Sequence, residues 1–298
     1  MLVDTHAHLN FSDYKNDLDK VINQAIKDGV TKIICVSSNL ADSAKAIEIA
    51  KKYPGVIYAA VGIHPHQTDP KNKLSLKKQI EALTKLAKQP EVIAIGECGL
   101  DYSPAPPPER DRSKGEQIFL FEKQIELALD LNLPILVHSR KAFDEVLFIL
   151  KRYLNSSKGK LAGVFHCYSG GKKDIPKVLN LDFYFGLDGN LTYDSGLQNV
   201  TKLIPLEKIL LETDCPFLSP EPYRGLRNEA YSASFWRNEA YSASFWRNEA
   251  YSASFWRNEP KNVRIIAEFL AQLKGLTLNQ LAKIVTKNTH AAFFGKTR

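Results

Sequence analysis

The sequence has little cysteine and no long apolar run. Its 298 residues include only four cysteines, which form no Cys-x-x-Cys pair, and so few scattered cysteines exclude a disulfide framework. No run approaches the roughly 18 apolar residues that a membrane-spanning helix needs. Met1 is followed almost at once by Asp4 and His6, which leaves no apolar export signal. The sequence therefore predicts a cytoplasmic protein that does not enter a membrane.

The first strand-to-helix loops also lack a Gly-x-Gly-x-x-Gly fingerprint, which removes the usual reason to predict a dinucleotide-binding fold. What the chain does contain is eight short apolar runs separated by segments with helical spacing. We predict strands near Leu2–Asp4, Lys32–Val36, Val56–Val61, Val92–Gly96, Ile135–Val137, Gly163–Phe165, Phe183–Phe185 and Ile209–Leu211. The helical segments are Asp17–Asp28, Asp42–Lys52, Leu74–Lys88, Gly115–Asn132, Lys141–Tyr153, Asn262–Leu273 and Leu278–Phe294.

Uniformly apolar strands that alternate with helices indicate a parallel sheet covered on both faces. Eight such units in a chain of this length favour a closed α/β structure, a TIM (β/α)8 barrel, over an open doubly wound sheet. We expect one domain that spans the whole chain, 1–298.

One stretch departs from this pattern. The decapeptide Arg-Asn-Glu-Ala-Tyr-Ser-Ala-Ser-Phe-Trp begins at Arg227 and occurs three times in succession, ending at Trp256. Exact identity is unlike diverged structural repeats, whose units are roughly 20–50 residues long. We predict a repeat insert at 230–259, after the eighth strand, that projects over the mouth of the barrel. The sequence leaves open whether Arg227-Asn228-Glu229 or Arg257-Asn258-Glu259 joins the barrel to Pro260.

Imidazole and carboxylate side chains follow five of the predicted strands, at the point where each strand ends. Side chains alternate along a strand, so His6 and His8 point the same way while Ala7 points away from them. The carboxyl ends of barrel strands converge on one mouth, where catalysis is found. Six side chains separated by more than two hundred positions are therefore expected to meet there: His6, His8, Glu97, His138, His166 and Asp214.

This donor set suits two divalent cations. His6, His8 and Asp214 would hold one, His138 and His166 the other, and Glu97 would bridge them. Imidazole with carboxylate favours Zn, Mn, Fe or Co, while added water ligands would admit Mg. Each histidine taken alone could equally be a hydrogen-bonded structural residue. The chain has seven histidines, however, and the shared position at strand ends argues for a joint site.

Several segments around these positions resemble the TatD family of deoxyribonucleases. They occur in that family's order: Asp4-Thr5-His6-Ala7-His8, Val61-Gly62-Ile63-His64-Pro65-His66, Ile95-Gly96-Glu97-Cys98-Gly99-Leu100-Asp101-Tyr102, His138-Ser139-Arg140, Phe165-His166-Cys167-Tyr168-Ser169-Gly170 and Glu212-Thr213-Asp214-Cys215-Pro216. The resemblance covers nearly the whole chain outside the repeat insert. It implies a TIM barrel, a metal-dependent DNase activity, often that of a 3′-exonuclease, and the same ligand assignment.

The His-x-His motif alone is shared with the wider amidohydrolase superfamily. There the bridging ligand is often a carboxylated lysine on the fourth strand, and Glu97 at that place favours the TatD branch.

The expected reaction is hydrolysis of a DNA phosphodiester bond. Divalent cations lower the pKa of a shared water towards neutrality, and Asp214 could accept its proton. His64 is not needed to complete either metal and could bind the phosphate or the leaving oxygen, with a loop-stabilising role as the alternative. Arg140 could pair with phosphate, whose oxygens its planar fork matches, or form a structural ion pair. The predicted catalytic residues are thus Asp214, Glu97 and His64.

Two other functions stay open. The same metals could serve a D-aminoacyl-tRNA deacylase or another amidohydrolase, since a fold does not decide the substrate. Alternatively, the Tyr, Phe, Trp and Arg of the insert could stack single strands, which would make the chain a nucleic-acid-binding or assembly protein. The net charge of +7 favours a polyanion such as DNA as partner. We expect a monomer, with an oligomer through the insert as the alternative.

Overall fold

The structure is a computed structural model that describes residues 1–67, 75–104, 113–156, 161–224 and 257–295. Eight strands follow one another around a single sheet in chain order, and every neighbouring pair is parallel. They are β1 Leu2–Ala7, β2 Val30–Val36, β3 Ile57–Val61, β4 Val92–Asp101, β5 Ile135–Arg140, β6 Gly163–Phe165, β7 Tyr184–Leu187 and β8 Ile209–Leu211. The predicted TIM barrel is confirmed. Four strands, β1, β4, β5 and β7, extend beyond their predicted carboxyl ends, because backbone pairing continues where the apolar pattern stops.

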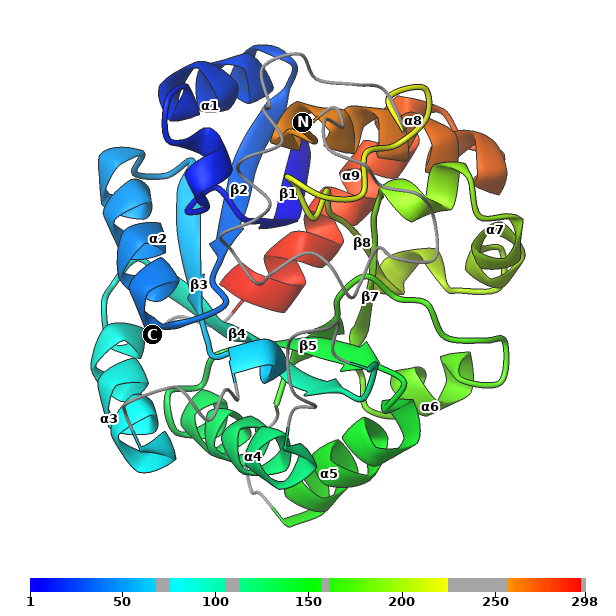
Figure 1. The fold of residues 1–298 in the computed structure, drawn as a ribbon. Coiled ribbons are helices and arrows are strands. Elements are labelled where there is room, and N and C mark those ends of the chain that lie inside the picture. The colour runs from blue at the N-terminus through cyan, green and yellow to red at the C-terminus, as the bar shows by residue number, and fades with distance from the viewer. Residues whose placement is uncertain (68–74, 105–112, 157–160, 225–256, 296–298) are drawn as a thin grey trace.

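Helices lie between the strands and form an outer ring around them (Figure 1). They are α1 Leu18–Lys27, α2 Leu40–Lys52, α3 Leu76–Ala87, α4 Lys114–Asp130, α5 Phe143–Ser156, α6 Ile175–Leu179, α7 Ser195–Thr201, α8 Val263–Lys274 and α9 Leu278–Thr289. The sequence pattern did not predict α6 and α7, since helices of five and seven residues are too short to show a period. In the described part of the chain, no helix has the length and apolar character to cross a membrane.

Polar caps fix where several helices begin. The side chains of Asn39, Ser75 and Ser113 accept hydrogen bonds from backbone N–H groups in the first turns of α2, α3 and α4. Thr277 and Gln280 form a reciprocal capping box at α9. Each cap satisfies donors that a helix leaves unpaired at its first turn, so these helices start at defined positions relative to the strands.

The barrel closes where β1 meets the segment that follows β8. The hydroxyl of Thr5 donates to the Leu211 carbonyl at 3.0 Å, and two backbone bonds follow: Asp214 N to His6 O at 2.9 Å and His8 N to Cys215 O at 2.8 Å. The buried carboxyl group of Asp4 accepts from both the backbone N–H (2.9 Å) and the hydroxyl (2.6 Å) of Thr213. This seam places Asp214 next to the two histidines of β1.

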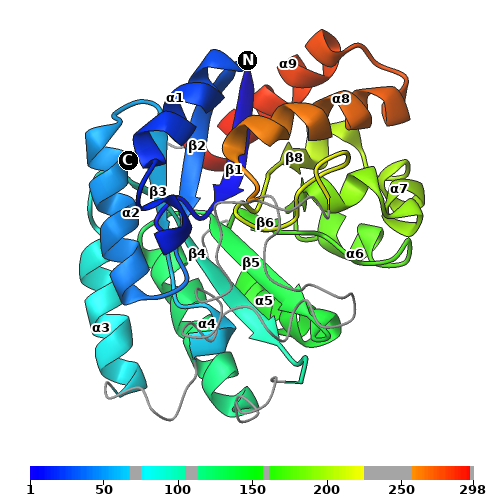
Figure 2. The ribbon, with the colours of Figure 1, turned by 45° about the horizontal axis from the view of Figure 1, so that its top comes forward.

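The C-terminal elements cover the opposite end of the barrel, as the turned view helps to follow (Figure 2). The hydroxyl of Thr286 in α9 bonds the carbonyl of Met1, and Asn288 bonds those of Leu206 and Ile209, all at the amino ends of strands. A π-helical turn, His290–Phe294, then packs Phe293 against apolar side chains of the barrel interior. The polar site is therefore confined to the other end.

The last Arg-Asn-Glu triplet of the repeat region belongs to the barrel. Arg257 forms a double hydrogen bond with Asp17 (2.8 and 2.7 Å). Asn258 is fully buried, and its amide donates to the carbonyls of Thr213 and Phe217 at 2.9 and 2.7 Å. Of the two triplets that the sequence left open, Arg257-Asn258-Glu259 thus fills the local role. The decapeptides themselves, and the predicted projection of the insert, lie outside the described residues.

Excising Ala230 through Glu259 should leave the melting temperature and the metal content of the protein unchanged. The excision brings Arg227-Asn228-Glu229 directly before Pro260, so an identical triplet can take the place of the one removed. Differential scanning calorimetry and metal analysis of the purified protein would measure both. Loss of the cooperative transition on excision would show that the repeats are part of the fold.

The matched control is the same excised chain with Asn228→Ala. This variant should lose about 1–3 kcal/mol of stability for each buried carbonyl left without its donor, because the Thr213 and Phe217 carbonyls would no longer be paired.

Candidate metal centre

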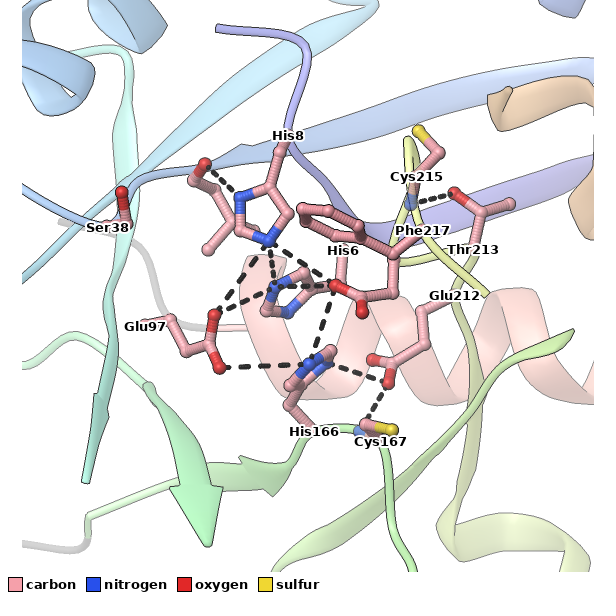
Figure 3. A network of polar contacts seen from close by, with 12 residues as sticks. His6, His8, Ser38, Glu97, His166, Cys167, Glu212, Thr213, Cys215 and Phe217 are labelled. Carbon is pink, nitrogen blue, oxygen red and sulfur yellow. Dashed lines mark hydrogen bonds and ion pairs between the residues drawn. The ribbon is translucent and has the colours of Figure 1, made fainter. Parts of the chain in front are cut away.

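The structure brings all six predicted ligands together at the carboxyl end of the barrel. His6 lies in β1 and His8 directly after it, Glu97 in β4 and His138 in β5, while His166 and Asp214 follow β6 and β8. All six are buried. Figure 3 shows His6 and His8, from β1 and the residue just after it, pointing toward Glu97 of β4 and His166 beyond β6. The structure thus shows the predicted convergence of these side chains, and their role as metal ligands stays a prediction.

The two oxygens of Glu97 face two different groups of imidazoles. Oε2 lies 3.4 Å from Nε2 of His6 and 3.9 Å from Nε2 of His8. Oε1 lies 2.6 Å from Nδ1 of His138 and 3.8 Å from Nε2 of His166. The carboxylate therefore stands between the two predicted half-sites.

Asp214 faces the site from the seam. Its Oδ1 lies 3.3 Å from Nε2 of His8, 3.7 Å from Nε2 of His6 and 3.6 Å from Nε2 of His166. This carboxylate is thus close to both histidines of β1 and also to a histidine of the other predicted half-site.

Irregular strand pairing aims the ligands of β1 and β4. The register of β1 against β2 shifts between Asp4 and Ala7, and that of β4 against β5 shifts between Ile95 and Cys98. Such irregularities redirect side chains and are common next to active sites. Just beyond the second one, Gly99 has φ +149°. A Cβ there would overlap the carbonyl oxygen of His138, so only glycine lets β4 approach this histidine so closely.

Three imidazoles are oriented by a contact on the ring nitrogen that points away from the site. Nδ1 of His8 lies 3.0 Å from the Val36 carbonyl, and Nδ1 of His166 lies 2.9 Å from Oε1 of Glu212. For His138 the outer nitrogen is Nε2, at 3.4 Å from Oδ2 of Asp101. Only the His8 approach is a hydrogen bond; among the described residues, Nδ1 of His166 and Nε2 of His138 face their carboxylates without forming one. An oxygen that faces the outer nitrogen favours a proton there and leaves the inner lone pair for a metal, as is usual for metal-binding histidines.

His6 is the fourth imidazole. Its ring stacks on that of His166 at a centroid distance of 3.6 Å, and among the described residues its buried Nδ1 has no hydrogen-bond partner. Nε2 of His6 faces Glu97 and Asp214. This ring is therefore held by stacking, and its inner nitrogen points toward both carboxylates.

The carboxylates of the site are ionised. Burial by itself would raise the pKa of Glu97, but the surrounding His64, His166, His138 and His6 hold that pKa well below its ordinary value. The pKa of Asp214 is likewise lowered by His166 and His8 against the opposing effect of burial. Two buried negative charges ringed by imidazole nitrogens form a donor set that fits divalent cations.

The structure places His64 beside the cluster. Its Nε2 is 3.5 Å from Oε1 of Glu97 and 3.3 Å from Nδ1 of His138. The backbone N–H of His66 donates to Nδ1 of His64 at 3.1 Å, and burial lowers the pKa of His64 to about 3. The ring is therefore neutral with its proton on Nε2, so it offers a hydrogen-bond donor where a metal ligand would need a lone pair.

Arg140 lies two residues after His138 in β5. This residue ends β5, is half-buried, and accepts a backbone hydrogen bond from Tyr102 at 3.0 Å. Its role in binding phosphate stays a prediction.

Sequence reasoning missed Glu212 and His66. Glu212 accepts from the backbone N–H of Cys167 at 2.6 Å in addition to facing His166. Nε2 of His66 lies 2.6 Å from the same Asp101 oxygen that faces His138. A signal was present in both cases, because each residue lies two positions from a predicted site residue, Asp214 or His64, as His6 does from His8.

Metal affinity should rise with pH, by about tenfold per unit for each imidazole proton that the metal displaces, until the pKa of His138 is passed. Burial lowers this pKa, but the carboxylates of Asp101 and Glu97 outweigh it and raise the pKa to about 9. Below that pH a metal must displace the proton from His138, so binding releases protons. Titration calorimetry from about pH 6.5 to 8.5 in buffers of different ionisation enthalpy would count them. Binding that releases no proton and does not change with pH would contradict the assignment of His138.

Comparisons with known proteins agree with this geometry. The sequence profile of the TatD-related DNase family matches residues 3–236. The chain is 33% identical over 296 residues to YabD of Bacillus subtilis strain 168, named as a metal-dependent hydrolase, with 98% of this chain and 99% of that protein covered. It is 31% identical over 227 residues to the 3′-5′ ssDNA/RNA exonuclease TatD of Erwinia tasmaniensis, with 75% and 83% covered.

Comparison with solved structures leads to the same family. The crystal structure of a TatD-family hydrolase from Entamoeba histolytica superposes with a TM-score of 0.78 at 26% identity, with 99% of this chain and 98% of that one covered. The chain therefore belongs to the TatD-related DNase family and is a metal-dependent hydrolase.

Proposed function

We propose that this protein is a deoxyribonuclease that removes nucleotides from the 3′ end of DNA, with a binuclear divalent-metal site. The observation that carries the proposal is the position of Glu97, whose two oxygens face separate groups of imidazoles. His6, His8 and Asp214 would hold one ion, and His138 and His166 the other. A relative named as a 3′-5′ ssDNA/RNA exonuclease and the net charge of +7 support a nucleic acid as substrate.

Divalent ions, when bound, supply electrophilic stabilisation of the phosphoryl oxygens and lower the pKa of water. Imidazole-rich coordination favours Zn or Mn, and water ligands would admit Mg. The chain's own residues then divide the remaining tasks. Asp214 is ionised and lies at the mouth, where it can accept the proton of the attacking water. His64 offers Nε2–H to a phosphate oxygen or to the leaving oxygen.

The alternative is that the same site hydrolyses a substrate other than DNA, and a comparison of three substrates tests it. Single-stranded DNA, a D-aminoacyl-tRNA and a simple ester would be incubated with the protein, with and without chelator. DNA labelled at the 3′ end should release labelled mononucleotide first, whereas 5′-labelled DNA should shorten progressively. Cleavage of the tRNA ester alone would overturn the proposal in favour of a deacylase. A monomeric state stays a prediction.

Glu97→Ala should abolish DNA cleavage and lower the metal content from two ions towards one or none. The fold should persist, because the Glu97 side chain lies among the imidazoles of the site and not in the apolar core. End-labelled DNA resolved by size, metal analysis and circular dichroism would measure the three quantities. The control is Glu48→Ala, an exposed glutamate in the second half of α2, the half that runs away from the mouth. Full activity of Glu97→Ala with two metals bound would sink the binuclear assignment.

His64→Ala should reduce turnover by about 10²–10⁴-fold if His64 transfers a proton, with the metal content unchanged. The reason is that the ring donates through Nε2 and that both half-sites are complete without it. The exposed His290 provides the control, since His290→Ala should leave turnover as it is. If metal is lost from His64→Ala, then His64 is a ligand and this role is wrong.

A further inference from the structure

Two glutamines are buried on the inner face of α4. Gln117 and Gln124 are seven residues apart, so they lie on the same side of the helix, two turns from each other. Their side chains are 1% and 0% exposed, and α4 packs against β4, as its place below the strands in Figure 1 shows. Neither belongs to the cluster of ligands.

Gln124 pairs with both backbone groups of one residue. Its Oε1 accepts from Ile63 N at 2.7 Å, and its Nε2 donates to Ile63 O at 3.0 Å. Ile63 lies beyond the end of β3 and directly before His64. The side-chain amide thus supplies the two bonds that a neighbouring strand would otherwise make.

Gln117 makes the same pair of bonds with Asp101. Its Oε1 accepts from Asp101 N at 2.8 Å, and its Nε2 donates to Asp101 O at 3.1 Å. Asp101 ends β4, and its carboxylate faces the outer nitrogens of His66 and His138. Gln117 therefore fixes the backbone that carries the carboxylate behind a predicted metal ligand.

Packing does not require amides at these two positions. The fully buried Phe121, Ile125 and Ala128 already give α4 an apolar contact with the barrel. Burial of an amide stabilises little unless its hydrogen bonds are made. Both amides bond the backbone next to the site, and Nε2 of Gln124 also donates to the Leu120 carbonyl within α4 at 3.1 Å. The shared geometry of the two pairs is what distinguishes them from ordinary core residues.

We propose that Gln117 and Gln124 are positioning residues, through which α4 holds Asp101 and His64 in place at the mouth. The inference rests on the proposed function only for the part that His64 plays in turnover. Gln124 sets the position of the His64 ring, while Gln117 sets the orientation of His138 through Asp101. A displacement of about 1 Å at such a group lowers turnover by about 10²-fold, and loss of an outer contact lowers metal affinity by about 10–100-fold.

The test for Gln124 uses Gln124→Met, which keeps the length of the side chain and removes the amide. DNA cleavage should show kcat reduced by about 10²-fold with KM and metal affinity unchanged. In the His64→Ala background the same substitution should cause no further loss, because the two residues act through one group. In protein with ¹³C-labelled histidine, the ring signal of His64 should move while that of His290 stays.

The test for Gln117 uses Gln117→Met and calorimetric titration with Mn²⁺. Affinity should fall by about 10–100-fold, and Asp101→Asn should add little to that loss. Neither this titration nor the histidine spectrum needs a nucleic-acid substrate. A wild-type protein that leaves DNA intact would therefore overturn the proposed nuclease, while these two measurements would still decide the role of the glutamines.

Asn288→Leu is the matched control. Asn288 is also a buried amide that bonds backbone carbonyls, at 2.8 and 2.9 Å from Leu206 O and Ile209 O, but at the other end of the barrel. It should lower the melting temperature and leave kcat, Mn²⁺ affinity and the His64 signal unchanged. If the glutamine variants behave in the same way, their role is structural only and the proposal is overturned. Should a Met variant not fold, the Glu variant at that position, which keeps the acceptor, takes its place in each measurement.

Discussion

The site depends on how the barrel closes. β8 ends at Leu211, whose carbonyl accepts from the Thr5 hydroxyl. The backbone bonds that close the barrel come from the residues just beyond β8, with Asp214 N on His6 O and His8 N on Cys215 O. These bonds bring a carboxylate from the end of the barrel next to two histidines from its beginning. Asp4 reinforces the seam from within, since its buried carboxyl group holds Thr213 between Glu212 and Asp214. Without this closure, Asp214 would not lie next to His6 and His8.

Burial of so many ionisable groups costs free energy, and contacts between the carboxylates and the imidazoles offset this cost. Glu97 and Asp214 keep their charges because imidazoles surround them, and the outer nitrogens of His8, His138 and His166 each face an oxygen. The same contacts that lower the cost of burial also leave the inner nitrogens free to bind a cation. Stability and metal binding therefore depend on one set of polar contacts, which ties the fold to the proposed chemistry.

Outer helices and loops take part in this arrangement as well. Gln117 and Gln124 connect α4 to the ends of β3 and β4, and Asn258 connects the start of the C-terminal segment to the residues on either side of Asp214 and Cys215. In each case a buried amide bonds backbone groups that no strand neighbour satisfies. The mouth is thus held from the outside by side chains that never touch the reacting atoms.

The sequence by itself determined the strands, the longer helices and the six side chains that meet at the mouth. Apolar runs and polar residues at strand ends are local signals, and alternation alone separated His6 and His8 from Ala7. Only the tertiary structure decided what depends on contacts between distant segments. Glu97 faces two groups of imidazoles, and Glu212 and His66 contact partners far away in the sequence. Arg257-Asn258-Glu259, and not an identical triplet, packs into the barrel. Identical sequences carry no local signal that could separate them, so their places follow from the surroundings into which each one packs.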